Sequence, residues 1–270
     1  VAVGEEVDTV KPGDRVIIHP KALWVAGRPT ARTARTMRGV NLPGALRELA
    51  AVSADTLVKA PNHLSWQQAA TLPIAATTAW NALVTADIGP GSTVVLLGTG
   101  GVSIYALQLA KARGASIVIA GRNAEKAQSA LQALGKLGVQ ARFIRADVTR
   151  KADCQALVSQ TAEAFGRVDI LVNNAGTSIR KMPQEFTEEE WHHVLDTNLT
   201  SAFLCSQAAY PAMKQAGGGK MINIGSMMSL FGAPFATPYA ASKGGIVQMT
   251  RALATAWAGD NIQVNAVLPG

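Results

Sequence analysis

The chain has 270 residues, 48% of them hydrophobic and 16% charged, with two cysteines and a formal charge of +7. This composition excludes a disordered chain and a disulfide-stapled scaffold, and no apolar run reaches the ~20 residues that a membrane span requires. The positive charge raises nucleic-acid binding as one function, but Arg28, Arg32, Arg35 and Arg38 have no aromatic residues among them on which bases could stack. A solvated basic loop is the favoured interpretation of this cluster.

Residues 1–90 predict short strands, loops and one helix. A turn over 11–14 leads into a strand over 15–18, and residues 21–50 are rich in turn formers. Residues 65–85 predict a helix with Ser65 as its N-cap and an interruption at Pro73. We interpret this part as a partial β-rich accessory segment, and the start at Val1 rather than Met as a cut inside a domain.

From about residue 92 the pattern changes to an alternation of buried strands and helices. Strands are predicted at 93–97, 116–120, 142–146, 169–172, 220–224 and 262–268. Helices are predicted from the glycine cluster to Arg113, from Asn123 to about Leu137, over 150–165, after a capping box at Thr187, and over 239–258. Apolar strands that alternate with helices predict an α/β fold, a doubly wound parallel Rossmann-type sheet over residues 91–270. Such sheets bind ligands at the carboxyl ends of their strands.

A glycine-rich loop follows the first strand of this sheet. It reads Gly98-Thr99-Gly100-Gly101-Val102-Ser103, which matches G-x-G-x-x-G except that Ser103 replaces the third glycine. Glycines permit a tight turn and a close approach of the backbone to a pyrophosphate, which then lies at a helix N-terminus. We therefore predict that Gly98, Gly100 and Ser103 bind a dinucleotide, with an ordinary strand-to-helix turn as the alternative.

The end of the second strand bears on the choice between the two nicotinamide dinucleotides. NAD-specific sites carry an acidic residue there, whereas this chain reads Ala120-Gly121-Arg122-Asn123. Arg122 could pair with a 2′-phosphate, so NADP is the predicted cofactor and NAD the alternative. Arg122 could also be simply an exposed residue ahead of the helix that Asn123 starts.

Four polar residues form the candidate catalytic group. Tyr239 and Lys243 lie four positions apart in a predicted helix and share a face. A free tyrosine has a pKa of about 10, and a neighbouring ammonium favours the phenolate, so the pair suits general acid–base chemistry. Ser226 follows a strand and can face the same pocket. Asn198 lies on the apolar face of the helix that Thr187 caps, where its amide is either structural or part of a polar network.

Together these residues resemble the short-chain dehydrogenase/reductase family, over about residues 115–270. The matching motifs are Asp147-Val148, Asn173-Asn174-Ala175-Gly176, Asn198, Ser226, Tyr239-x-x-x-Lys243 and Pro269-Gly270. The resemblance implies that Tyr239 exchanges a proton with the substrate oxygen, assisted by Lys243, which also binds the nicotinamide ribose. It implies that Ser226 orients the carbonyl and that Asn198 holds a water of the proton relay.

The same resemblance implies a cofactor-binding edge and a substrate class. Asp147 and Val148 would border the adenine, and Asn174, Ala175 and Gly176 the adenosine side. The residues around Ser226 and Tyr239 are similar to the gluconate 5-dehydrogenase and 2-deoxy-gluconate 3-dehydrogenase branch, which acts on sugar acids. An oligomer formed through the helices that begin near Thr187 and Tyr239 is also implied.

The N-terminal part departs from that family, because the glycine signature T-G-x-x-x-G-x-G is absent. Residues 1 to about 115 instead resemble the zinc-free, quinone-reductase-like branch of the medium-chain dehydrogenase/reductase family, on segments 1–16, 57–83 and 94–111. We interpret the chain as a hybrid joined near 110–120, with a truncated medium-chain part and a short-chain part that stops before its usual substrate-covering end. The four histidines have no cysteine or carboxylate at ligand spacing, so no metal site is predicted.

Two functions from different classes follow. The first is an NAD(P)-dependent oxidoreductase that transfers a hydride between nicotinamide and a carbonyl or secondary alcohol, of a sugar acid on the resemblance. The second is a catalytically inactive recombinant that at most binds a dinucleotide, because the family's glycine signature and substrate lid are missing. The expected setting is the cytoplasm, with a small-molecule substrate, no nucleic acid and no membrane.

Overall fold

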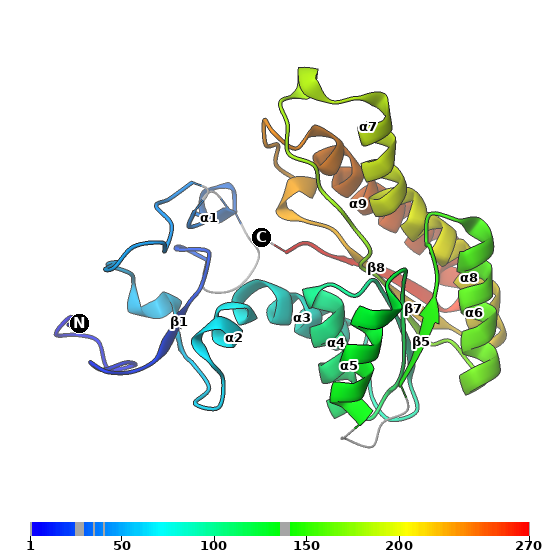
Figure 1. Ribbon diagram of the computed structural model, residues 1–270, viewed down its shortest axis with the longest axis horizontal. Coiled ribbons are helices and arrows are strands. Elements are labelled where there is room, and N and C mark those ends of the chain that lie inside the picture. Colours follow the sequence, from blue (N-terminus) through cyan, green and yellow to red (C-terminus); the bar gives the residue numbers. More distant parts are fainter. Residues whose placement is uncertain (1, 25–29, 35, 40, 136–140, 270) are drawn as a thin grey trace. The chain divides into compact units, whose positions relative to one another are not determined.

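The structure, a computed structural model, describes residues 2–24, 30–34, 36–39, 41–135 and 141–269 (Figure 1). The chain divides after Thr77 into two compact units. The predicted boundary near residue 90 falls within the second unit, because helix α3 (Thr77–Thr85) buries Ala79, Ala82 and Leu83 in the core beneath the large sheet. The contacts therefore divide the chain at the first residue of α3 rather than after the helix.

The first unit contains a small antiparallel sheet. Strands β1 (Val16–Ile18) and β2 (Leu57–Lys59) pair with Val16 opposite Lys59. The strand predicted after the turn over 11–14 is thus confirmed, whereas its partner β2 was not predicted. Arg15 anchors this sheet to the following turn, because its guanidinium donates to the carbonyl oxygens of Asn62 and Leu64.

Short helices make up much of the remaining regular structure of the first unit. They are α1 (Ala31–Ala34) and α2 (Trp66–Ala70), together with a 3-10 turn over Ala54–Thr56. Ser65 caps α2 as predicted: its hydroxyl accepts the Gln68 N–H, and the Gln68 side chain accepts the Ser65 N–H. The interruption predicted at Pro73 is a π-helical turn over Leu72–Ala76 that leads into α3.

The basic cluster of the first unit is described only in part. Arg28 and Arg35 lie outside the described residues. Arg32 is exposed, in agreement with a solvated cluster. Arg38 is half-buried, and its buried Nε has no hydrogen-bond partner among the described atoms. Arg38 is therefore not a freely solvated charge.

The second unit is built on a six-stranded parallel sheet. Its strand order is β5-β4-β3-β6-β7-β8, and the strands are β3 (Thr93–Leu97), β4 (Ser116–Gly121), β5 (Ala141–Arg145), β6 (Ile170–Asn173), β7 (Gly219–Ile224) and β8 (Ile262–Val267). All neighbouring strands pair in parallel. The doubly wound sheet predicted from the sequence is confirmed.

Helices connect these strands and cover both faces of the sheet. Besides α3 they are α4 (Gly101–Ala112), α5 (Ala124–Gly135), α6 (Lys151–Phe165), α7 (Glu188–Leu195), α8 (Ser201–Gln215) and α9 (Thr237–Trp257). Thr187 caps α7 by accepting the Glu190 N–H, as predicted. The predicted end of α5 at Leu137 lies outside the described residues. Among the helices described, none has the length and apolarity needed to cross a membrane.

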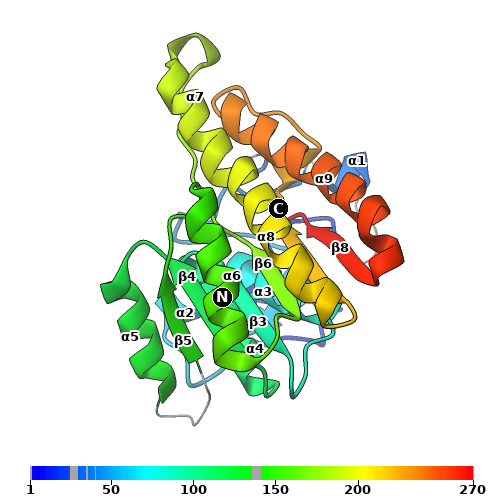
Figure 2. The ribbon, with the colours of Figure 1, turned by 90° about the vertical axis from the view of Figure 1, so that its right-hand side faces the viewer.

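Successive strand residues point to opposite faces of the sheet, which gives two apolar cores. Val94 and Leu96 face α3 and α4, whereas Val95 and Leu97 face α6, α8 and the end of α9. Figure 2 looks onto the second of these layers, with α6, α8 and α9 in front of the strands. Burial on both faces explains why the strands are apolar almost throughout.

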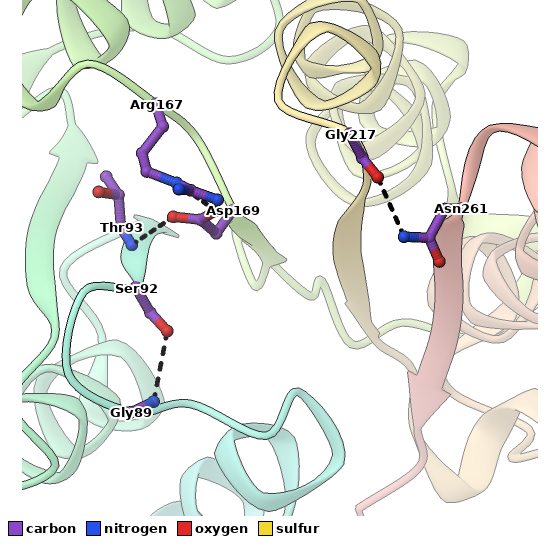
Figure 3. Close-up of polar contacts among 7 residues, drawn as sticks. All are labelled: Gly89, Ser92, Thr93, Arg167, Asp169, Gly217 and Asn261. Atoms are coloured by element: carbon purple, nitrogen blue, oxygen red, sulfur yellow. Dashed lines mark hydrogen bonds and ion pairs between the residues drawn. The ribbon is translucent and has the colours of Figure 1, made fainter.

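The amino ends of the strands meet at one edge of the sheet. There the Asp169 carboxylate accepts the Thr93 N–H at 2.8 Å and pairs with Arg167 at 2.6 Å, which joins the starts of β3 and β6 (Figure 3). Ser92 caps the turn before β3 by accepting the Gly89 N–H at 3.3 Å. A hollow of about 500 Å³ opens beside these residues. The predicted cofactor residues lie at the other ends of the strands.

Candidate active site

A pocket of about 310 Å³ lies at the carboxyl ends of β3, β4, β5 and β6. Its lining includes eight of the nine residues predicted for cofactor binding alone: Gly98, Gly100, Arg122, Asp147, Val148, Asn174, Ala175 and Gly176. These residues come from four separate loops, each of which directly follows a strand. The parallel sheet therefore brings together residues that are far apart in the sequence.

The glycine loop has the geometry of a phosphate cradle. Gly98 has a φ of +89°, a conformation that disfavours any residue with a side chain, and its N–H donates to Ala120 O at 2.7 Å. Gly100 is the N-cap of α4, so the unpaired first N–H groups of that helix lie at this loop. An anion is stabilised at such a helix N-terminus. The backbone here fits the pyrophosphate of a dinucleotide.

Ser103 lies beneath this loop rather than in the pocket lining. It is buried, its hydroxyl donates to Leu97 O at 2.9 Å, and it accepts a hydrogen bond from Asn174 Nδ2 at 2.9 Å. The hydroxyl thus joins the end of β3 to the loop that follows β6. A glycine at this position could make neither bond.

Cations and one carboxylate line the far end of the pocket. Arg122 and Lys126 contribute the cations, Lys126 from the first turn of α5. The Asp147 carboxylate accepts both the hydroxyl and the N–H of Thr149. These bonds lower the pKa of Asp147, and the charges of Arg122 and Arg150 lower it further. Asp147 is therefore ionised at neutral pH and is suited to accept hydrogen bonds.

The two adjacent asparagines at the end of β6 point in opposite directions. Asn173 is buried, and its Nδ2 donates to Ser206 Oγ at 3.0 Å and to Asn223 Oδ1 at 2.7 Å, so it ties β6 to α8 and β7. Asn174 faces the glycine loop and the pocket. The alternation of strand side chains explains why one amide is structural while its neighbour lines the pocket.

Asn198 occupies a π-helical turn, Asp196–Thr200, that joins α7 to α8. The sequence predicted one continuous helix here, without this turn. Asn198 is buried; its Oδ1 accepts the Thr177 N–H at 2.7 Å, and its Nδ2 donates to Thr177 O and to Ser242 Oγ, each at 3.0 Å. Ser242 Oγ in turn donates to Tyr239 O. The amide is therefore part of a network that reaches the Tyr239 backbone.

Tyr239 and Lys243 share one face of α9, as their spacing predicted. Lys243 Nζ lies 5.7 Å from the centre of the Tyr239 ring and donates to Ile224 O at 2.7 Å. Lys243 is buried, and the loss of hydration lowers its pKa to about 8. A Cβ added to Gly176 would lie 3.8 Å from Lys243 Nζ and 3.4 Å from Asn198 Oδ1. This glycine therefore marks the point where the pocket meets the predicted catalytic residues.

Ser226 lies in the loop after β7, two residues beyond Ile224, whose carbonyl Lys243 contacts. Its Oγ accepts the Met228 N–H at 3.2 Å, which uses an oxygen lone pair and not the hydroxyl hydrogen. The hydroxyl keeps a donor for a substrate oxygen. Ser226, in the loop after β7, and Tyr239 and Lys243, on α9, thus lie at the same edge of the sheet.

A family comparison agrees with this arrangement. The sequence profile described as short chain dehydrogenase matches residues 93–270, which is well over half of the chain. The chain belongs to the short-chain dehydrogenase family. The match begins at Thr93, so it includes the glycine loop and starts ahead of the junction near 110–120 that the sequence analysis placed between two families.

Relatives of this short-chain dehydrogenase act on several carbonyl and alcohol substrates, by their names. The chain is 43% identical over 157 residues to 5-keto-D-gluconate 5-reductase of Escherichia coli K12, an alignment that covers 58% of this chain and 62% of the relative. It is 38% identical to 3alpha-hydroxysteroid dehydrogenase of Mediterraneibacter gnavus, over 66% of this chain and 72% of the relative. The chain thus spans less than two thirds of the reductase's length.

A solved structure shows the same fold. A presumed gluconate dehydrogenase of Agrobacterium tumefaciens superposes with a TM-score of 0.64 at 35% identity, over 67% of this chain and 72% of the other. The likeness is confined to about two thirds of each chain, in keeping with a family match that omits residues 1–92.

Sequence reasoning missed several residues of the site. Thr99, Asn123, Lys126, Thr149 and Thr197 also line the pocket. A signal existed for two of them, because Asn123 and Lys126 form the cap and first turn of the helix that follows the second strand. Ser242 had no signal of its own, since its role depends on a contact with Asn198, which is distant in the sequence.

Proposed function

We propose that the chain is an NAD(P)-dependent oxidoreductase that interconverts a ketone and a secondary alcohol. The observation that carries this proposal is the junction at Gly176, where the dinucleotide-shaped pocket meets Lys243 and Asn198. The pocket residues fit a dinucleotide through the glycine loop, the N-terminus of α4 and the cations at its far end. Bound nicotinamide would supply or accept the hydride.

The residues of the chain move the proton. In the direction of reduction, the Tyr239 hydroxyl transfers its proton to the carbonyl oxygen as the carbonyl carbon gains a hydride, and the alcohol forms. The Lys243 ammonium stabilises the phenolate that Tyr239 becomes. The Ser226 hydroxyl donates a hydrogen bond to the same substrate oxygen, which favours the charge that develops there. Asn198 orders the polar network behind Tyr239.

An acidic substrate is supported by an unpaired guanidinium on a segment that follows the residues in contact with Asn198. Arg180 stacks on the Phe235 ring at 5.5 Å, and within the described part of the chain it has neither an ion pair nor a hydrogen bond. Its neighbour Lys181 is paired with Glu190. Arg180 is three residues from Thr177, which contacts Asn198, and Phe235 is four residues before Tyr239. A guanidinium held there suits a substrate carboxylate, and relatives named for keto-gluconate agree.

A substrate panel tests the proposed function. The chain is mixed with NADPH or NADH and with sugar-acid ketones, each beside a neutral ketone of similar size, and nicotinamide absorbance is followed. We expect turnover that favours the acids. If nicotinamide fluorescence shows cofactor binding but no ketone of the panel is turned over, the result would favour the alternative, an inactive chain that binds a dinucleotide.

We also propose NADP as the preferred cofactor, because Arg122 and Lys126 both line the far end of the pocket and a 2′-phosphate carries two charges that they can pair with. Asp147 lies at the same end, and a carboxylate there can accept hydrogen bonds from either cofactor.

Two further proposals concern the whole chain. We propose that the part of the chain before the sheet derives from a medium-chain dehydrogenase, a shorter stretch than the residues 1 to about 115 of the resemblance, because the short-chain family match begins at Thr93. The separate compact unit up to Thr77 supports this. We propose that the chain forms a homo-oligomer through α7, α8 and α9, on which Phe203 is 42% exposed. Light scattering coupled to size exclusion would give the mass of that assembly.

A further inference from the structure

Ser229 links the two elements that carry the catalytic group. Its Oγ accepts the Ser226 N–H at 3.2 Å and donates to Lys243 O at 2.6 Å. The direction of both bonds is fixed, because an N–H can only donate and a carbonyl oxygen can only accept. One hydroxyl therefore joins the loop after β7 to the helix that carries Tyr239 and Lys243.

A second bond joins the same two elements from the other side of Ser226. Lys243 Nζ donates to Ile224 O at 2.7 Å. Residues 224 and 229 are thus both attached to Lys243, one through its side chain and the other through its backbone. Ser226 lies between the two attachments, and Lys243 is one helical turn from Tyr239.

Packing around Ser229 leaves little room for another arrangement. A Cβ added to Gly225 would lie 3.0 Å from Ser229 Oγ and 3.2 Å from Leu268, so a side chain at 225 would displace the Ser229 hydroxyl. Ser229 N–H donates to Ser226 O at 2.9 Å, which closes the turn from the other direction. The turn Met227–Ser229 is held by reciprocal bonds between Ser229 and the N-cap Ser226.

We propose that Ser229 is a positioning residue for carbonyl reduction: through its hydroxyl it fixes Ser226 relative to Tyr239 and Lys243. This inference rests on the proposed function. Ser229 need not touch the substrate, because a shift of about 1 Å in a hydrogen-bond donor lowers rates by about 100-fold.

The test measures kcat, KM and cofactor affinity for Ser229→Ala, Ser229→Thr and Ser226→Ala. Ser229→Ala should lower kcat/KM by roughly 10- to 100-fold with little change in cofactor affinity, whereas Ser229→Thr retains the hydroxyl and most of the activity. When Ser229→Ala is added to Ser226→Ala, kcat/KM should fall by less than about threefold further, because the Ser226 hydroxyl that Ser229 positions is already gone. If Ser229 had a purely structural role, Ser229→Ala would lower kcat/KM by the same factor in the wild type and in Ser226→Ala.

Ser92→Ala is the matched control, since it also removes a serine that caps a turn, at the opposite edge of the sheet (Figure 3). If circular dichroism shows that Ser229→Ala does not fold, Ser229→Cys takes its place. Cysteine is similar in size to serine but a weak hydrogen-bond donor, so the same fall in kcat/KM is expected. Two results overturn this inference and leave the proposed function intact. One is a Ser229→Ala variant that turns over as fast as the wild type, and the other is an equal fall in kcat/KM with and without Ser226→Ala. A wild-type chain without turnover overturns both.

Discussion

Lys243 carries a positive charge in a buried position, and this has a consequence for stability. Burial lowers its pKa to about 8, from 10.5 in the unfolded chain. Between these values the unfolded chain binds more protons than the folded one, so stability rises with pH across this window. Below pH 8 the ammonium is charged in both states, and the cost of its burial is present in full.

This stability profile can be measured by urea unfolding of the wild type and of Lys243→Met. From pH 7 to 9.5 the wild type should gain about 2 kcal/mol relative to the variant, which lacks the titrating group. Turnover of the wild type should fall over the same range, as the charge that favours the phenolate is lost. Parallel stability profiles for the two proteins would contradict the lowered pKa.

Arg122 sets the cofactor preference on our account. Arg122→Ala should lower the preference for NADPH over NADH by roughly 10- to 100-fold, because a charge-assisted bond to the 2′-phosphate is lost. Affinities from nicotinamide fluorescence give this ratio. Arg145→Ala is the control, an exposed arginine one strand away that is absent from the pocket lining. An unchanged ratio in Arg122→Ala would assign the preference to Lys126 or to neither cation.

At the scale of elements, the glycine loop depends on Ser103, which stands where the pattern G-x-G-x-x-G has its third glycine. Ser103→Ala would leave Asn174 Nδ2 with only a 3.4 Å contact to Leu97 O. We expect a loss of about 1–2 kcal/mol of stability and a rise of roughly tenfold in the cofactor dissociation constant. Calorimetry of unfolding and cofactor titration measure both. A loss of stability without weaker cofactor binding would restrict Ser103 to the core.

The sequence predicted the second unit closely, because strands buried on both faces and capped helices leave strong local patterns. The bounds of β3 to β8 fall within one residue of the prediction. The π-helical turn at Asn198 was missed, since one additional residue in a turn does not alter the apolar pattern that flanks it. The links made by Ser229 and Ser242 were missed because each depends on a tertiary contact.

At the scale of the whole molecule, the chain combines a nearly regular dinucleotide-binding sheet with a separate unit that the family match omits. The sequence predicted a boundary near residue 90, whereas the contacts divide the chain at the start of α3. Weak periodicity made the first unit hard to predict, because its strands have only three residues each and pair across a long loop.

On our proposal, this sheet supports hydride transfer with Tyr239 as the proton donor. The most direct measurement compares the wild type with Tyr239→Phe, both with NADPH and a keto-gluconate, for turnover and for cofactor binding. We predict turnover by the wild type and a loss of at least about 100-fold in the variant, with cofactor affinity retained. Equal turnover by the two proteins, or none by a wild type that binds NADPH, would contradict the account.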